Sequence, residues 1–330
     1  MLVPSLNTLI GDIGGTNTRL MYLGSNGDIK RKTYPSQQYS DLITIVQSFI
    51  EDYKLSIERA SFGVAGPVFD EVKAKVTNLP WHLEAKEFEQ KLSISKVKFI
   101  NDFMAVGYGI ELLSDEDYCY IHDNKTTVNN PNAAIIGAGT GLGVAHRVFI
   151  EGQYRILTSE TGHSGFSPEN NQQLDLHAWL LQSISPVSME MLLSGPGLVN
   201  IFRYFSYINY GDNYEQNIAD ILSLADPAKY ISESGLNKVD EVCEQALNCF
   251  VDIYASAIGD IALHYYPIEE IYIAGGIAAK IKSKLVTDDF VKHMHNKGKM
   301  SENLSRITIK LVEQGDIGLY GALNYIIIQE

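Results

Sequence analysis

Hydrophobic residues gather along this chain in short segments and in a longer repeat of three to four residues. The short segments, which are mostly apolar, predict strands at residues 9–13, 60–65, 97–100, 133–138, 271–274 and 307–312. The helical repeat predicts helices at residues 42–53 and 237–266. Because strands alternate with helices, the chain is predicted to be an α/β protein that binds its ligands at strand ends.

Polar residues and prolines predict where the helices begin and end. Ser40 is expected to cap the first helix, Pro267 to stop the long one, and Asp316 to cap a final helix that reaches residue 329. Residues 115–132 are polar and end in Asn129-Asn130-Pro131-Asn132, which predicts a turn-rich linker. We expect the boundary between two domains just before this segment.

Two of the strands run into glycine-rich turns. The first reads Gly11-Asp12-Ile13-Gly14-Gly15-Thr16-Asn17 and the second Gly137-Ala138-Gly139-Thr140-Gly141, about one domain's length further on. Glycine adopts positive φ and lets a ligand approach the backbone, so such turns can direct N–H groups at phosphate. Asp12 would repel phosphate unless a cation lay between them, which predicts a metal–phosphate site. The alternative is an ordinary glycine hairpin, because short glycine motifs often arise by chance.

Asn101-Asp102 directly follows the strand at residues 97–100 and is the strongest candidate for catalysis. An Asp at a strand end is presented to a cleft, and the Asn beside it can donate a hydrogen bond to a hydroxyl or accept one. The alternative is a helix N-cap, for which Asn and Asp are favoured.

Other polar positions have two interpretations each. Glu160 and His163 lie three apart beside glycine, and they could be metal ligands or could bind a polyol. Glu190, taken alone, would be a solvated helix face. Asn78 with Trp81 is either a sugar-binding pair or a loop held by an aromatic anchor. A serine hydrolase is disfavoured, because the chain has no Gly-x-Ser-x-Gly elbow.

Composition narrows the function classes. The net charge of −14 argues against nucleic acid, whose binding depends on Lys and Arg that neutralise phosphates. The three cysteines lack metal-binding spacing and are expected to be reduced thiols. The N-terminus does not resemble a signal peptide, and no run approaches the ~20 apolar residues that span a bilayer. A cytoplasmic protein without a membrane partner is therefore expected.

At this point the motifs resemble a known family, the ATP-dependent, non-ROK bacterial glucokinases of the actin-like ATPase and hexokinase superfamily. The resemblance covers essentially the whole chain. It rests on the two glycine turns and on motifs in the family's order, namely Thr77-Asn78, Ile100-Asn101-Asp102-Phe103, Glu160 with Gly162-His163, Leu193-Ser194-Gly195-Pro196-Gly197-Leu198-Val199-Asn200 and Ala274-Gly275-Gly276-Ile277. It implies two actin-like (ribonuclease H-like) α/β domains with a cleft between them. Residues 1–113 plus about 313–330 would form the small domain, and residues 114–312 the large one.

The resemblance also implies a role for each candidate residue. Transfer of the γ-phosphoryl of ATP to the 6-hydroxyl of glucose would use Asp102 as general base. Sugar-binding residues would be Asn78, Asn101, Asp102, Glu160, His163 and Glu190. ATP would be held by Gly11, Asp12, Ile13, Gly14, Gly15, Thr16, Asn17, Gly137, Gly139, Thr140, Gly141, Gly275 and Gly276. Asp12 would contact Mg²⁺ through Mg-ATP, directly or through water, and the protein would be a homodimer.

Two departures from the family pattern concern the sugar side. Ser159 and Thr161 flank Glu160 where the family usually has glycine, and the loop of Trp81 varies in the family. A kinase for another hexose is therefore one alternative, and a non-enzymatic sugar-binding protein of the same fold is another. The first phosphate strand begins by Thr8, so we expect no N-terminal helix-turn-helix of the kind that a regulator would carry.

Overall fold

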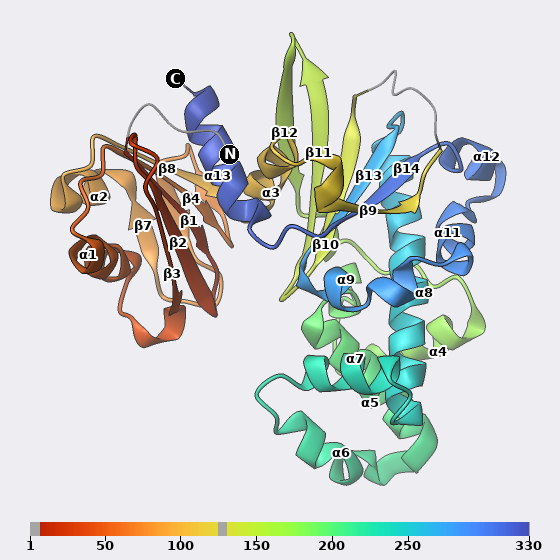
Figure 1. Ribbon diagram of the computed structural model, residues 1–330. Coiled ribbons are helices and arrows are strands. Elements are labelled where there is room, and N and C mark those ends of the chain that lie inside the picture. Colours follow the sequence, from red (N-terminus) through yellow and green to blue (C-terminus); the bar gives the residue numbers. More distant parts are fainter. Residues whose placement is uncertain (1–6, 125–130, 330) are drawn as a thin grey trace. The chain divides into compact units, whose positions relative to one another are not determined.

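A computed structural model describes residues 7–124 and 131–329. The chain forms two compact units, coloured along the sequence in Figure 1. Unit 1 comprises the residues up to Asp117, Ile156–Thr158 and the residues from Gln314 onward. Unit 2 comprises Tyr118–Arg155 and Ser159–Glu313.

The main sheet of unit 1 has five strands, β1 (Thr8–Ile13), β2 (Asn17–Leu23), β3 (Ile29–Pro35), β4 (Arg59–Val64) and β8 (Lys96–Asn101). Their order is β3-β2-β1-β4-β8. The pairs β1–β2 and β2–β3 are antiparallel, whereas β4 is parallel to both β1 and β8. In this register Ile13 is level with Val64, and Val64 with Asn101. The glycine turn and the Asn-Asp pair therefore lie at the same edge of one sheet.

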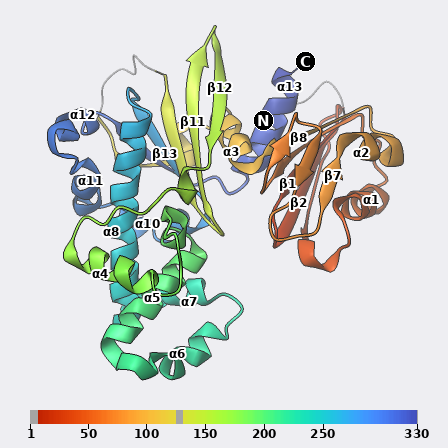
Figure 2. The ribbon, with the colours of Figure 1, turned by 180° about the vertical axis from the view of Figure 1, so that it is seen from behind.

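Helices pack on both faces of this sheet. They are α1 (Leu42–Tyr53), α2 (Ala85–Leu92), α3 (Asp102–Ile110) and α13 (Ile317–Ile328). Leu42 of α1 and Phe88 of α2 belong to the buried cluster on one face, and Leu323 of α13 packs with Ile10 and Met21 on the other (Figures 1 and 2). Beside them are a small sheet of β5 (Val68–Phe69), β6 (Lys73–Lys75) and β7 (His82–Glu84) and the 3₁₀ turns Ser36–Gln38 and Asp115–Asp117.

The sheet of unit 2 has six strands. They are β9 (Tyr118–His122), β10 (Ala133–Ala138), β11 (Leu142–Ile150), β12 (Gln153–Ser159), β13 (Glu270–Ala274) and β14 (Thr308–Val312), in the order β12-β11-β10-β13-β14-β9. The β10–β11 pair is antiparallel, β13 is parallel to β10 and β14, and β9 closes the edge antiparallel to β14.

The long helix α8 (Glu241–His264) lies in the buried core of unit 2 (Figure 1). Phe250 and Ile258 of α8 share one buried cluster with Phe202 of α5 (Gly195–Tyr210) and with Ile273 and Leu311 of the sheet. The other helices are α4 (Asn171–Leu180), α5 (Gly195–Tyr210), α6 (Tyr214–Leu222), α7 (Pro227–Leu236), α9 (Gly276–Lys280), α10 (Lys282–Leu285), α11 (Asp288–His295) and α12 (Ser301–Leu304). The 3₁₀ turns are η3 (Thr161–His163), η4 (Met189–Met191), Gly211–Asn213 and Gly298–Met300.

The two sheets share one topology, an antiparallel meander followed by parallel strands. In each unit the glycine turn joins the strand at the centre of the sheet to its antiparallel neighbour, β1 to β2 and β10 to β11. The α/β class predicted from the alternating pattern is confirmed, and the two halves do repeat one architecture.

The linker predicted at residues 115–132 is wrong in part. Residues 118–122 form β9, an edge strand paired with β14, whereas residues 125–130 lie outside the described part of the chain. Tyr118 packs on Tyr272 with ring centroids 5.6 Å apart, and Lys310 lies 5.3 Å from the centre of the Tyr118 ring. Tyr118, Tyr120 and Ile121 are residue types that strands favour, but the strand is short and lies between polar segments, so hydrophobic spacing alone does not mark it.

Three predicted helix boundaries are also corrected. Asp41 rather than Ser40 caps α1, because its Oδ1 accepts a hydrogen bond from Thr44 N at 2.7 Å. Asp240 caps α8, which leaves Val239 before the helix and 76% exposed. Asp316 precedes α13 but makes no side-chain cap, since its carboxylate accepts from Arg31 at 2.7 Å. Which residue caps a helix depends on its backbone angles and on the other partners of its side chain. The spacing of hydrophobic residues contains no information on either.

Helix α8 is long and apolar enough to cross a membrane by length and composition alone. Its most apolar window is 78% buried inside the structure, as the core helix of a globular unit would be.

The three cysteines are free thiols, as expected. Cys243 and Cys249 are buried in α8, and burial raises the pKa of both thiols, that of Cys249 to about 12. Protonated buried thiols of this kind are inert.

Candidate functional site

The glycine turn of unit 1 is closed by backbone hydrogen bonds. Gly14 N donates to Asn17 O at 3.0 Å, and Ser36 N donates to Thr16 O at 2.9 Å. The hydroxyl of Ser36 donates to Gly14 O at 2.7 Å. These bonds fix the turn from the side of β3, so its shape is set before any ligand binds. Ser36, which follows β3, was not selected from the sequence.

Asp12 faces Arg19 across the hairpin, because the antiparallel register pairs these two residues. The carboxylate accepts from Arg19 Nε at 3.1 Å and from a terminal guanidinium nitrogen. Arg19 also donates to Gly315 O at 2.8 Å. Arg19 was not predicted as a site residue, although a hairpin with its turn between Ile13 and Thr18 places it opposite Asp12.

The carboxylate of Asp12 is an oxygen ligand of the kind that suits a Mg²⁺ ion bound to a nucleotide. Mg²⁺ keeps several waters and is usually held by one or two carboxylates together with substrate phosphates. Asp12 supplies one carboxylate beside the glycine turn. Among the described residues no group of three His, Cys, Asp or Glu side chains could form an all-protein metal cage.

Asn78 and Trp81 have different surroundings. A Cβ atom at Gly15 would lie 3.1 Å from Thr77 O and 3.5 Å from Asn78 Cβ, so Asn78 borders the glycine turn. Its side chain is exposed, and its φ of 64° lies in the left-handed region that Asn tolerates. Trp81 is only 2% exposed and belongs to the core of unit 1. The aromatic-anchor interpretation is therefore correct for Trp81, whereas Asn78 remains open to a ligand.

Asn101 and Asp102 stand where β8 becomes α3, as predicted. Asn101 is the N-cap, and its Oδ1 accepts from Phe103 N at 2.9 Å and Met104 N at 3.2 Å. Because the carbonyl oxygen is occupied, Asn101 can offer a ligand the two donors of its amide group. Oδ1 of Asp102 accepts from Phe103 N at 2.9 Å, which fixes this side chain at the first turn of the helix.

The glycine turn of unit 2 is held by α5. Gly139 N donates to Gly141 O, and Gly195 N, at the start of α5, donates to Gly139 O, both at 2.8 Å. Ser194 caps α5 by accepting from Gly197 N at 3.0 Å. Nothing lies within 4 Å of a Cβ position at Gly139, so this part of the turn is open to a ligand.

Glu190 is not the solvated helix face that its sequence context suggested. It lies in η4, and its Oε2 accepts from Leu142 N, at the start of β11, at 2.8 Å. Gly141 is directly beside it, because a Cβ atom there would lie 2.5 Å from Glu190 Oε2. The structure therefore brings Glu190 to the glycine turn, although the two are distant in sequence.

Glu160 and His163 point toward one another beside η3, with Glu160 Oε2 3.8 Å from His163 Nε2. Their side chains are 88% and 62% exposed, so both can contact a ligand. They belong to no group of three metal-ligating side chains in the described part of the chain. This geometry favours hydroxyl binding over metal binding.

Gly275 and Gly276 lie where β13 becomes α9, beside the second glycine turn. Gly275 has a φ of 90°, and a Cβ atom there would lie 2.6 Å from Ala138 O, whereas one at Gly276 would meet nothing within 4 Å. Among the glycines assigned to the nucleotide, only Gly275 has positive φ. Neither of the two glycine turns therefore uses the positive φ that glycine tolerates, and at Gly139 the missing side chain leaves room for a ligand instead.

We expect Gly275→Ala to lower the thermal stability and Gly276→Ala to change it little. The first substitution combines a strained left-handed φ, which costs about 1–3 kcal/mol, with a contact against backbone that cannot swing away. The measurement is the Tm of each variant by calorimetry. Equal Tm values for the two alanine variants would contradict this account of Gly275.

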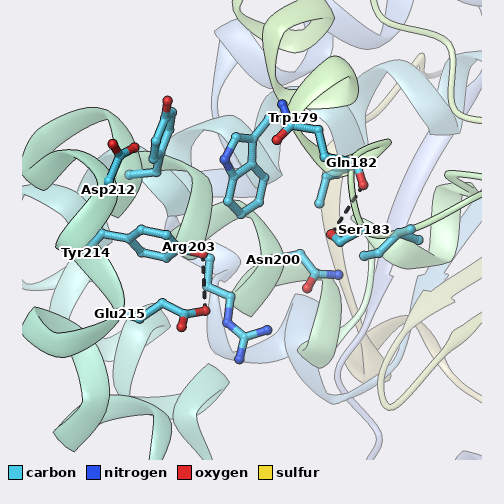
Figure 3. A pocket seen from close by; sticks show the side chains of 11 residues that line it. Trp179, Gln182, Ser183, Asn200, Arg203, Asp212, Tyr214 and Glu215 are labelled. Carbon is cyan, nitrogen blue, oxygen red and sulfur yellow. Dashed lines mark hydrogen bonds between the residues drawn. The ribbon is translucent and has the colours of Figure 1, made fainter.

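A cavity of about 550 Å³ opens between α4 and α5 in unit 2, and Figure 3 shows its side chains. Trp179, Arg203 and Tyr214 contribute to its lining, together with Asp212 and Glu215. None of the predicted site residues lines it. The candidate chemistry of unit 2 therefore lies elsewhere, around Leu142.

Comparison with known proteins gives one consistent result. A family model described as Glucokinase matches residues 9–327. The glucokinase of Nostoc sp. strain PCC 7120 is 35% identical over 333 residues, which cover 95% of this chain and 97% of the relative. The glucokinase of Synechocystis sp. is 32% identical over 347 residues, covering 96% and 97% of the two chains.

Solved structures give the same answer. The crystal structure of glucokinase from an Antarctic psychrotroph matches with a TM-score of 0.80 at 29% identity, covering 98% of this chain and 99% of that one. A ROK family glucokinase from Streptomyces griseus, in complex with glucose and AMPPNP, matches with a TM-score of 0.66. It is 20% identical, with 98% of this chain and 100% of that chain covered, so this likeness concerns the fold alone.

Proposed function

The chain belongs to the glucokinase family, which makes it an ATP-dependent glucose kinase, and we propose that the residues described above carry out the reaction. The observation that supports this most strongly is the match over residues 9–327, because it includes both glycine turns and every candidate side chain. The reaction is transfer of the γ-phosphoryl of ATP to the 6-hydroxyl of glucose, which gives glucose 6-phosphate and ADP.

Unit 1 supplies the base in this proposal. The oxygen of the 6-hydroxyl attacks the γ-phosphorus, the bond to ADP breaks, and the hydroxyl proton passes to the carboxylate of Asp102. Phosphoryl transfer has a loose transition state, so orientation of the hydroxyl matters more than the strength of the base. The hydrogen bond from Phe103 N holds Oδ1 of Asp102, and the amide group of Asn101 donates to a sugar hydroxyl. Asn78, exposed beside the turn, binds the sugar as well.

Unit 2 supplies three further sugar contacts in this proposal, from Glu160, His163 and Glu190. A carboxylate can accept from two neighbouring hydroxyls, and a histidine can donate from one ring nitrogen. The open space at Gly139 leaves room for phosphate oxygens beside the turn, and Gly137, Gly139, Thr140 and Gly141 would border them. Gly275 and Gly276 border the adenosine, where Gly276 leaves the backbone uncovered.

Mg²⁺ would neutralise charge that develops on the phosphates. Asp12 would hold the ion, directly or through water, while Gly14, Gly15, Thr16 and Asn17 offer backbone to the phosphates. Arg19 keeps the carboxylate of Asp12 in place from the opposite strand.

We also propose that the protein is a cytoplasmic homodimer without a nucleic acid or membrane partner. Family resemblance supports the dimer, and the net charge of −14 supports the lack of a nucleic acid partner. Light scattering on the purified protein tests the dimer, and a mass of one chain would contradict it.

The catalytic proposal is tested by a coupled assay of ADP release from Mg-ATP, with and without glucose. We expect ADP release to require both glucose and Mg²⁺. Release at the same rate without glucose would indicate an ATPase, and release without Mg²⁺ would remove the metal from the reaction.

A further inference from the structure

Leu142, the first residue of β11, has its backbone N–H and its carbonyl oxygen beside candidate sugar-binding segments. Its N–H donates to Glu190 Oε2 at 2.8 Å. Its carbonyl oxygen faces Gly162 of η3, so closely that a Cβ atom at residue 162 would overlap it. Glu160 and His163 flank Gly162 in sequence. The backbone of Leu142 thus contacts both segments that carry Glu160, His163 and Glu190.

The two segments are also joined to each other. Met189 N donates to Ser164 O at 2.9 Å, and Phe166 N donates to Val187 O at 3.0 Å. These bonds run on both sides of an isolated β-bridge between Gly165 and Ser188. The segments that carry Glu160, His163 and Glu190 therefore form one hydrogen-bonded unit that rests on the start of β11.

The absence of a side chain at two positions permits this arrangement. At Gly141 a Cβ atom would lie 2.5 Å from Glu190 Oε2 and 3.2 Å from Glu190 Cδ. A carboxylate pushed from this place would lose its bond to Leu142 N. At Gly162 the neighbour is backbone, which cannot move aside. By contrast, nothing lies within 4 Å of a Cβ position at Gly165, in the same loop.

We propose that the backbone of Leu142 aligns the sugar-binding side chains of unit 2, with Gly141 and Gly162 as positioning residues for hexose recognition. This inference rests on the proposed roles of Glu160, His163 and Glu190. Leu142 N–H holds Oε2 of Glu190, which directs the remaining lone pairs of the carboxylate to sugar hydroxyls. Gly141 thus serves the sugar as well as the phosphate turn in which it lies, because its missing side chain leaves room for Glu190.

The test is glucose binding without nucleotide, measured by calorimetry on the full chain. We expect Gly141→Ala to raise the glucose Kd about tenfold or more, since it misplaces a hydrogen bond to a charged group. The variant should fold, because the displaced group is the end of a flexible side chain, and its Tm checks this. The matched control is Gly165→Ala, which should leave the glucose Kd unchanged.

A double-mutant cycle separates positioning from general damage. If Gly141 acts through Glu190, adding Gly141→Ala to Glu190→Gln should raise the glucose Kd far less than Gly141→Ala does alone. This inference would be overturned if the effects of the two substitutions on the glucose Kd were fully additive, or if Gly141→Ala had a wild-type glucose Kd. Neither result would affect the proposed role of Glu190 in binding glucose. A wild-type glucose Kd in Glu190→Gln would instead show that Glu190 does not bind glucose, and would overturn both proposals for this residue.

Discussion

Asp102→Ala is expected to lower kcat for glucose phosphorylation by about 10²–10⁴-fold, the usual contribution of a general base. The side chain lies at the first turn of α3, at the carboxyl end of β8, and is fixed by Phe103 N. Removing it leaves Asn101, which caps the helix and whose amide group we propose as a sugar contact. Glucose should therefore still bind, and the loss should fall on kcat more than on KM.

Asp102→Asn is the matched variant for this measurement. The asparagine retains an oxygen that can accept from Phe103 N and keeps the size of the side chain, but it cannot take a proton. We expect it to lose as much kcat as the alanine variant, with Tm and glucose Kd close to wild type. Activity of either variant within a few-fold of wild type would remove Asp102 from the mechanism.

Glucose is expected to exceed mannose and galactose in kcat/KM by about 5- to 150-fold for each hydrogen bond that the epimer loses. Glu160, His163 and Glu190 place two carboxylates and one imidazole on segments tied to a single backbone position. An inverted hydroxyl leaves one of these groups without a partner once the sugar covers it. An unpaired buried polar group costs about 1–3 kcal/mol, and more when it is charged.

Glu160→Gln tests the same contact from the side of the protein. The side chain is 88% exposed without a ligand, so the substitution should not affect stability, and any change reports on binding. We expect a higher glucose KM and a smaller change in the ATP KM. The differences in kcat/KM among the hexoses should also become smaller. Equal kcat/KM for glucose, mannose and galactose, together with a silent Glu160→Gln, would overturn this account of hexose recognition and leave a kinase of unknown acceptor.

The cross-strand partner of Asp12 shows where prediction from sequence could have gone further. Once the turn between Ile13 and Thr18 is taken as a hairpin, its register places Arg19 opposite Asp12, as the structure has it. Glu190 is a different case. No local pattern distinguishes it from a helix surface, because its partner Leu142 N lies in another segment of the chain.

Sequence patterns are enough to predict the α/β class, the two glycine turns, the junction at Asn101-Asp102 and the family. These features depend on local spacing, on glycine content and on short motifs, all of which are written along the chain. Tertiary structure alone decided that residues 118–122 form an edge strand, that Trp81 is core and that Glu190 meets the glycine turn. The physical reason is that an edge pairing, a burial or a hydrogen bond between distant segments depends on the partner that folding supplies.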